Sequence, residues 1–247
     1  MQDQLVTFSL VLMLTMLVNS DSKSQGLGLD TSSLPAYKNA VTFYNKTLKE
    51  ELHLFNGKED KGYAYQFTEG TPYFLTNKWS KGSLNYNGEI YEDVSLLYDA
   101  ARDELVYLYF DNASAIRLIK DKVSGFSVMG HHFIHITPDS LHSSSIAPGF
   151  YDELYNGNNK LIAKRTKNIQ TNIRQSGAEM KVFYKDHYYL RKSDKYYPVN
   201  NKRSFLSNLS DKKKELQQYI RQNRLNFKKD IENAMTKTLA YYDQLIK

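Results

Sequence analysis

The chain has 247 residues and a net charge of +6, which allows one large domain or one domain with an extension. It contains no cysteine, so disulfides, thiolate metal sites and cysteine nucleophiles are excluded. There are 20 tyrosines and 12 phenylalanines, and these side chains favour the surfaces of β-sheets. The composition therefore predicts a folded chain rich in β-structure.

The charge is divided unevenly along the chain. Residues 1–159 hold 12 Lys and Arg against 19 Asp and Glu, a net charge of −7, whereas residues 160–247 hold 21 against 8, a net charge of +13. This asymmetry indicates either an anionic partner for the basic part or docking of the two parts on each other. A solvated lysine-rich surface is the simpler alternative.

The first predicted element is the apolar run at residues 5–18. It is short for a membrane-spanning helix, which needs about 20 residues, and its length is typical of the hydrophobic core of a signal peptide. Small residues suited to cleavage follow it. We therefore expect a signal peptide at residues 1–24 and export to the periplasm, the cell surface or the medium. The residues before the run include no Lys or Arg, so an uncleaved anchor and a buried core helix stay open.

Residues 25–61 are expected to form a flexible N-terminus and a short helix. Residues 25–35 are rich in Gly and Ser, which disfavours regular structure. Residues 37–55 place apolar side chains near helical spacing and end before Asn56-Gly57, which predicts the helix.

From residue 62 to about residue 201 the apolar period becomes two, which predicts strands. The clearest signal is a hairpin with Asn87-Gly88 as its type I′ turn. A second turn at residues 99–103 precedes residues 105–110, which are apolar on both faces and should lie inside the sheet. Further strands are expected near residues 116–119, 126–136, 149–155, 160–166, 181–184, 188–191 and 196–199.

Residues 202–247 have a helical period and a basic character. Ser210 or Asp211 can cap a helix at residues 212–223, and a second helix is predicted at about 229–246. Both are amphipathic, so each needs a surface to pack on. We therefore predict an α+β protein: a mostly antiparallel β meander (an open sheet, a sandwich or a partly closed barrel), followed by basic amphipathic helices packed on the β region.

The histidines at positions 131, 132 and 135, with His142 nearby, are the best candidates for a metal site. On a strand, residues four apart lie about 13 Å from each other, so His131 and His135 can share an ion only if the strand bends. A helical metalloprotease motif needs Glu after its first His, and here that residue is His132. Packed or surface histidines are therefore favoured, and no metal or cofactor is predicted.

Asp99, Asp103 and Glu104 are the best candidates for acid–base catalysis, because they flank one predicted turn. Such chemistry needs two carboxyl groups in different environments of one cleft, whereas turn carboxylates usually face water. Ser143–Ser145 follow His142, but adjacency in sequence does not make a catalytic triad. The chain also lacks glycine-rich nucleotide motifs. We therefore favour a protein that is not an enzyme. The alternative is an envelope hydrolase whose carboxylate or histidine site is not recognisable from the sequence.

The basic C-terminal helices carry the candidate docking surface, which consists of Lys212, Lys213, Lys214, Arg221, Arg224, Lys228 and Lys229. Such charges can bind nucleic acid, but export argues against that partner and favours an anionic envelope component or a protein. The apolar stripes of the helices are assigned to packing on the sheet. An outer-membrane β-barrel is a further alternative, because alternating tyrosine-rich strands are typical of it, although the basic helical end argues against it.

Several stretches resemble a group of uncharacterised exported proteins of Gram-negative bacteria. The stretches are LFNG at 54–57, KGSLNYNG at 81–88 with Tyr98-Asp99, GFYDELYNG at 149–157, and KRSFL at 202–206. The resemblance implies export and strands followed by helices, and it carries no activity. The expected function is that of an exported, non-enzymatic binding or envelope-accessory protein.

Overall fold

The computed structural model describes residues 57–109, 113–137, 146–174 and 177–246, together with Pro35, Lys38 and Asn39, which are helical. The chain divides into a unit of residues 1–41 and a unit of residues 42–247, and the fold below is that of the second unit. The predicted signal peptide, most of the predicted helix at 37–55, His142 and Ser143–Ser145 lie outside the described residues.

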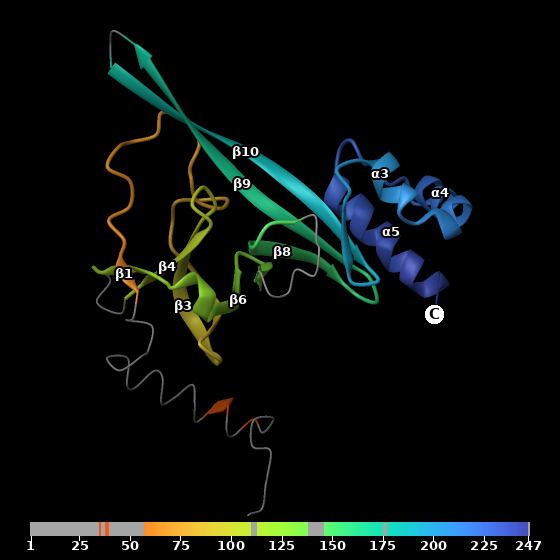
Figure 1. The fold of residues 1–247 in the computed structure, drawn as a ribbon, viewed down its shortest axis with the longest axis horizontal. Coiled ribbons are helices and arrows are strands. Elements are labelled where there is room, and N and C mark those ends of the chain that lie inside the picture. Colours follow the sequence, from red (N-terminus) through yellow and green to blue (C-terminus); the bar gives the residue numbers. More distant parts are fainter. Residues whose placement is uncertain are drawn as a thin grey trace, which may run out of the picture. The chain divides into compact units, whose positions relative to one another are not determined.

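Within the described residues, eleven strands form a single open, antiparallel sheet, which confirms the predicted α+β class (Figure 1). Their order across the sheet is β1-β5-β4-β3-β2-β6-β7-β8-β9-β10-β11. The meander thus runs outward from β2 in both directions. The strands are β1 (Lys58–Glu59), β2 (Ser80–Tyr86), β3 (Glu89–Asp99), β4 (Glu104–Leu108), β5 (Ala115–Arg117), β6 (Val123–Val128), β7 (His131–Ile136), β8 (Gly149–Asn156), β9 (Lys160–Arg174), β10 (Gly177–Lys192) and β11 (Lys195–Pro198).

The turns that the sequence predicts most clearly are present. Asn87 and Gly88 join β2 to β3 with φ angles of 53° and 85°, as a type I′ turn requires. The turn at residues 99–103 joins β3 to β4. The strand β4 has a neighbour on each side and buries Leu105, Val106 and Tyr107, which confirms its predicted place inside the sheet.

Two strand predictions are wrong. The single strand expected at 126–136 is a hairpin of β6 and β7 whose turn is Met129-Gly130, both with positive φ. Methionine gives no turn signal, so the apolar run concealed the break. The separate strands expected at 181–184 and 188–191 are one strand, β10, because continuous pairing with β9 overrides the polar residues between them.

An aromatic cluster fills the sheet face where β3, β6, β7 and β8 lie. Phe126 and Phe133 stand opposite each other on β6 and β7 with stacked rings 4.7 Å apart. Tyr98 of β3 lies 4.9 Å from Phe133 and 5.3 Å from Phe126. These side chains are fully or almost fully buried, and aromatic pairs of this geometry contribute about 0.5–1.5 kcal/mol each beyond the burial of area.

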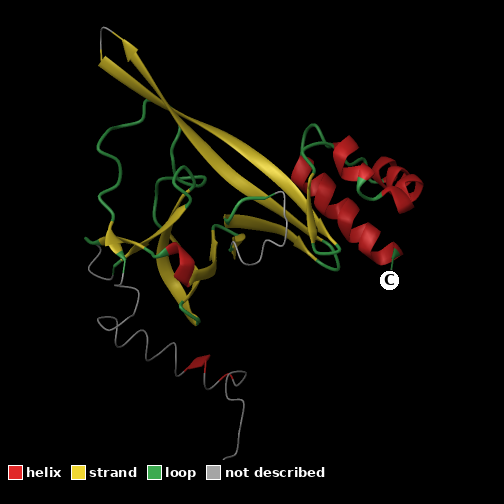
Figure 2. Cartoon of the chain, in the orientation of Figure 1, coloured by secondary structure: helices red, strands yellow, loops and turns green. Residues whose placement is uncertain are grey.

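The three C-terminal helices lie together beside the base of β9 and β10, which is the end of the hairpin where Lys160 pairs with Arg191 (Figure 2). They are α3 (Lys202–Ser207), α4 (Lys213–Gln222) and α5 (Ile231–Leu245). Asn201 caps α3 in a reciprocal capping box with Ser204, and Asp230 caps α5. The predicted caps of α4 are wrong: Ser210 and Asp211 belong to a 3₁₀ turn, and no side chain caps α4. The Asp211 carboxylate instead accepts a hydrogen bond from Tyr242 Oη at 2.9 Å.

The helices and the sheet share a second apolar cluster. The sheet contributes residues of β9 and β10, and each helix contributes buried side chains, including Phe205, Leu216 and Met235. Asp243 of α5 adds a polar anchor, because its buried carboxylate accepts hydrogen bonds from the backbone and side chain of Asn159, at 3.1 and 2.6 Å. The helices are therefore part of the same packed unit as the sheet.

This shared cluster predicts that a cavity under α4 weakens the whole unit. Leu216→Ala should lower the free energy of unfolding by about 2–5 kcal/mol, with helix circular dichroism and Trp79 fluorescence shifting together in urea. Gln217→Ala, one residue away and exposed, is the control and should change stability by less than about 0.5 kcal/mol. Loss of helix signal with an unchanged Trp79 transition would contradict the prediction.

Candidate functional site

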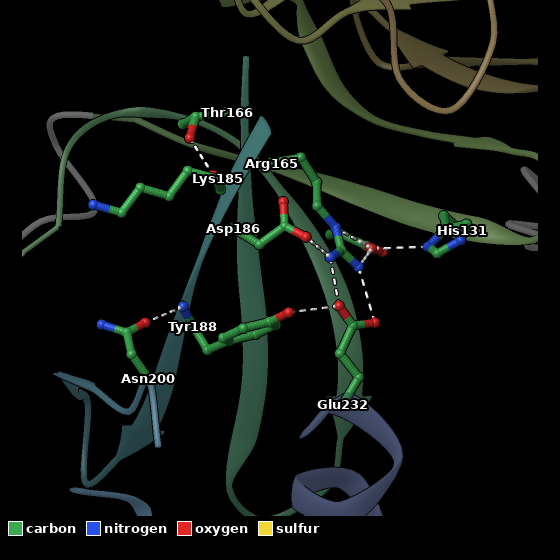
Figure 3. A network of polar contacts seen from close by, with 9 residues as sticks. His131, Arg165, Thr166, Lys185, Asp186, Tyr188, Asn200 and Glu232 are labelled. Atoms are coloured by element: carbon green, nitrogen blue, oxygen red, sulfur yellow. Dashed lines mark hydrogen bonds and ion pairs between the residues drawn. The ribbon is translucent and has the colours of Figure 1, made fainter. Parts of the chain in front are cut away.

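A cluster of buried and half-buried charged groups centres on Arg165 of β9 (Figure 3). Its Nε and Nη2 donate to Asp152 Oδ2 at 3.0 and 2.5 Å. Its Nη1 donates to Asp186 Oδ2 at 2.8 Å and to Glu232 Oε1 at 2.5 Å, and Nη2 reaches Glu232 Oε2 at 3.1 Å. One guanidinium therefore binds three carboxylates, and it holds Glu232 through both nitrogens of its fork.

The strand register explains why these residues meet. Asp186 stands directly opposite Arg165, and Asp152 stands opposite Ala163, two residues from Arg165. Residues two apart on a strand share a face, so His131, Asp152, Arg165 and Asp186 form a line across β7, β8, β9 and β10. Glu232, in the first turn of α5, closes the cluster from the helical side.

His131 and Tyr188 extend this cluster at its two ends. His131 Nδ1 lies 2.8 Å from Asp152 Oδ2, and its ring meets Phe74 edge to face at 4.9 Å. Tyr188 Oη donates to Glu232 Oε1 at 2.9 Å. Every charged group of the cluster thus has a partner of opposite charge or a hydrogen-bond donor, as burial demands.

The contacts shift the pKa values of the cluster in consistent directions. The hydrogen bond to Asp152 raises the pKa of His131 above 6.5, against the effect of burial. Burial alone would raise the pKa of Glu232, but its hydrogen bonds to Arg165 hold that pKa below 4.5. Burial would lower the pKa of Arg165, yet Glu232 and Asp152 hold it above its ordinary value. The cluster therefore favours its ionised form.

A second cluster surrounds Asp103, one of the predicted carboxylates. Tyr98 Oη donates to Asp103 Oδ1 at 2.7 Å, Lys164 Nζ lies 2.7 Å from Oδ2, and Lys120 also donates to Oδ2. Lys164 in addition donates to the carbonyl of Phe150 at 3.0 Å. Burial lowers the pKa of Lys164, and against the effect of burial the two lysines hold the pKa of Asp103 below 3.8.

Glycine at position 149 makes room for this second cluster. A Cβ there would lie 2.3 Å from Asp103 Oδ2 and 2.5 Å from Lys164 Nζ, and the backbone φ is +144°. Any larger residue would therefore displace the ion pair as well as strain the backbone. The cluster ties the β3–β4 turn to the start of β8.

The other two predicted carboxylates have separate partners. Asp99 is only 2% exposed and accepts hydrogen bonds from Tyr63 Oη at 2.8 Å and from the backbone N–H groups of Ala101 and Arg102 at 3.0 Å. Glu104 pairs with Arg117 at 2.9 Å. The turn is where the sequence predicts it, but its carboxylates hold the fold together rather than facing water or converging on one cleft.

The candidate metal ligands do not meet either. His131 contacts Asp152, His132 shares a hydrogen bond with Ser127 at 2.9 Å, and His135 packs against the Phe150 ring at 5.0 Å. Among the residues that the structure describes, no group of three or more His, Asp or Glu side chains is arranged to hold a metal ion.

The predicted docking surface is exposed. Lys213, Lys214, Arg221, Arg224, Lys228 and Lys229 face solvent, and Lys212 is half-buried. None of these seven forms an ion pair with an acid of the described chain, unlike Arg165, Arg117 and Lys164 on the sheet. Lys214 and Arg221 are seven residues apart on α4, so they share a helix face, and the others lie at its start and in the connection to α5.

No helix of the described part is long and apolar enough to cross a membrane. Comparisons with protein-family models, curated proteins and solved structures gave no match to the chain. The roles of these residues therefore follow from their geometry, and the resemblance to exported proteins stays a prediction.

Removal of the Arg165 guanidinium should leave three acids beside one another. Arg165→Met is expected to lower the free energy of unfolding by about 3–5 kcal/mol at pH 8, because uncompensated buried charges are costly. The loss should shrink at pH 5, because burial, no longer opposed by Arg165, raises the pKa of Glu232 and favours its protonation. Arg191→Met, which breaks an ion pair with the exposed Asp194, is the matched control and should cost under about 1 kcal/mol. A loss of equal size at both pH values would refute this account.

The raised pKa of His131 predicts a definite pH dependence. The contact between His131 and Asp152 should stabilise the fold fully below pH 6.5 and lose its effect as the pH rises through the folded-state pKa. The difference in unfolding free energy between the native chain and His131→Asn should therefore decrease from pH 6 to pH 8.5. His187→Asn, on β10, serves as the comparison. A difference that grows with pH would show that the histidine is held neutral.

Proposed function

We propose that the protein is an exported, non-enzymatic binding protein that attaches to an anionic membrane surface of the cell envelope through its C-terminal helices. The observation that carries the proposal is the docking surface of seven basic residues at positions 212–229, six of which are exposed and none of which forms an ion pair within the described chain. The buried or half-buried cations of the sheet at positions 117, 164 and 165, in contrast, form ion pairs within the fold.

The attachment of the helices to the sheet supports a binding role. The bonds from Arg165 to Glu232 and from Asn159 to Asp243 fix α5, and the shared apolar cluster fixes α4. The basic side chains therefore project from a rigid base. Less conformational entropy is lost when such a preorganised surface binds.

The chemistry of the outer face favours contact with headgroups and not insertion into a bilayer. Between residues 201 and 230 no large apolar side chain is exposed, and the exposed positions of α4 include Gln217, Gln218 and Gln222. A surface that inserts would present a broad apolar face. Lysines and arginines near an anionic membrane contribute about 1 kcal/mol each, so seven can support salt-sensitive attachment without insertion.

The apolar run at residues 5–18 and the resemblance to exported proteins support placement in the envelope. We do not propose the alternative, an envelope hydrolase, because Asp99, Asp103, His131 and His135 each hold a contact that joins parts of the fold.

The test uses residues 25–247 and vesicles of phosphatidylglycerol with phosphatidylethanolamine. Neutralising four cations of the docking surface (Lys214→Gln, Arg221→Gln, Lys228→Gln, Lys229→Gln) should weaken binding at least tenfold and flatten its decrease with salt. The control removes the same charge from exposed lysines elsewhere: Lys58→Gln, Lys78→Gln, Lys185→Gln and Lys195→Gln. Both variants must keep the native circular dichroism spectrum.

Binding that is equal for the two variants, or that is equally strong to phosphatidylcholine vesicles, would refute the proposal. Binding to a soluble anionic polysaccharide but not to the vesicles would show that the surface recognises a polymer instead of a membrane.

A further inference from the structure

Several parts of the chain cover one face of the β9–β10 hairpin, but not along its whole length. Near residues 161–163 and 188–190 the face packs on the C-terminal helices, and the Arg165 cluster lies two residues further along. At the next level Tyr184 is 78% exposed, and after it Val182 is buried and lies against Gly70. Past Val182 the cover ends within the described residues, and Ile173 is 86% exposed.

The outer edge of β9 is also unpaired at this end of the hairpin. β8 pairs with β9 only as far as Ala163, and no other strand of the described chain takes its place. The corresponding edge of β10 is occupied, because Thr68 N donates to Met180 O and Val182 N donates to Glu69 O, both at 2.9 Å. The hairpin therefore has one covered edge and one free edge.

These two bonds determine which groups face the free edge. Met180 and Val182 direct their backbone groups away from β9, so their pairs with β9 are of the non-hydrogen-bonded kind. Their partners are Thr171 and Ile169, whose N–H and C=O groups must point away from β10. Backbone groups two residues apart on a strand point to the same side, so the N–H and C=O groups of Ile173 also point away from β10. In the described chain, Ile169, Thr171 and Ile173 thus each present an unpaired N–H and C=O group at the free edge.

The composition of this edge is unusual for a strand that remains unpaired. Residues 168–173 (NIQTNI) contain no charged residue, no proline and no glycine. Edge strands of monomeric proteins are usually protected by lysine, proline or a bulge, and β9 has none of these between Lys167 and Arg174. An uncharged strand with Ile169 and Ile173 on one face is suited to pairing with another strand.

We propose that this edge pairs, antiparallel, with the same edge of a second copy of the chain, about a two-fold axis at Thr171. In this register Ile169 stands opposite Ile173 of the second copy, and Thr171 stands opposite its equivalent. All the outward N–H and C=O groups of these residues then find partners. On the other face Gln170 stands opposite Asn172, and no like charges meet between residues 169 and 173.

The self-complementarity of the edge favours a second copy over an unrelated strand. A two-fold axis at Thr171 places residues that are equally far from Thr171 opposite each other, so these residues must be compatible. Here isoleucine meets isoleucine, and one amide side chain meets another. Ile169, the end of the pairing nearest to β8, is six residues beyond Ala163, roughly 20 Å at 3.3 Å per residue, so the paired residues do not overlap those that pair with β8. The exposed Ile173 of each copy would gain apolar neighbours.

The absence of cysteine from the chain makes the register directly testable in the full-length protein. Opposed residues of an antiparallel pair lie 4.5–5.5 Å apart at Cα, within the range of a disulfide. A mixture of Gln170→Cys chains and Asn172→Cys chains should form disulfide-linked dimers at least tenfold faster than either chain alone. Crosslinking no faster than that of an exposed Ser193→Cys control would overturn the proposal, and faster linkage of Gln170→Cys to itself would overturn the register.

A proline variant separates pairing from folding. The Thr171 N–H points to the free edge, so Thr171→Pro removes a donor to the second copy and none from the β9–β10 ladder. This variant should keep the native circular dichroism spectrum and sediment as a monomer at concentrations where the native chain sediments as a dimer. A native chain that remains monomeric up to about 0.5 mM would overturn the proposal.

Discussion

A guanidinium with a side chain only 8% exposed needs anions around it, and Arg165 satisfies that need with carboxylates from two strands, β8 and β10, and one helix, α5. Loss of hydration is costly for each of these ions, so the cluster is stable only when β8, β9, β10 and α5 are all in place. It lies between two apolar clusters, the aromatic one beneath Phe74 and the one under the helices. The Arg165 cluster thereby restricts the position of α5 on the sheet more tightly than apolar packing does, because hydrogen bonds are directional and apolar contacts are not.

The acids and bases of the chain consequently fall into two populations. On the sheet, the buried or half-buried carboxylates of Asp99, Asp103 and Asp152 are paired with Arg102, Lys164 and Arg165, respectively. On α4 and the connection to α5, the cations are exposed and unmatched within the described chain. Only some of the basic residues in the C-terminal part of the sequence are therefore paired with acids inside the fold. Exposed lysines occur elsewhere too, but seven basic residues that are unpaired within the described chain lie close together in the sequence at positions 212–229, and this density is the basis of the proposed attachment to a membrane.

Local patterns were sufficient to predict the class of fold and many of its parts. Asn87-Gly88 has a turn geometry that few other pairs can adopt, and the amphipathic period at about 229–246 correctly predicts α5, which buries Met235, Thr238 and Tyr242. Met129-Gly130 was missed because its turn depends on glycine in a context that otherwise favours a strand. The Arg165 cluster could not be predicted, since Asp152 and Glu232 are far apart in the sequence and meet only through the register of β8 and β9 and the position of α5. The only sign of the cluster in the sequence is that Arg165 is a charged residue within the strand predicted at 160–166.

The β9–β10 hairpin shows how the same strand can serve folding at one end and association at the other. Near its base, alternate residues are covered by helices and by the charge cluster, and changes there act on stability. Beyond Val182 the outer edge of β10 is bonded to Thr68, whereas β9 is held within the described chain by its ladder with β10, and its Ile173 is exposed. An uncharged edge at such a place increases the risk of aggregation, and a closed two-fold pairing lowers that risk because the β9 edge of each copy is then occupied by the other.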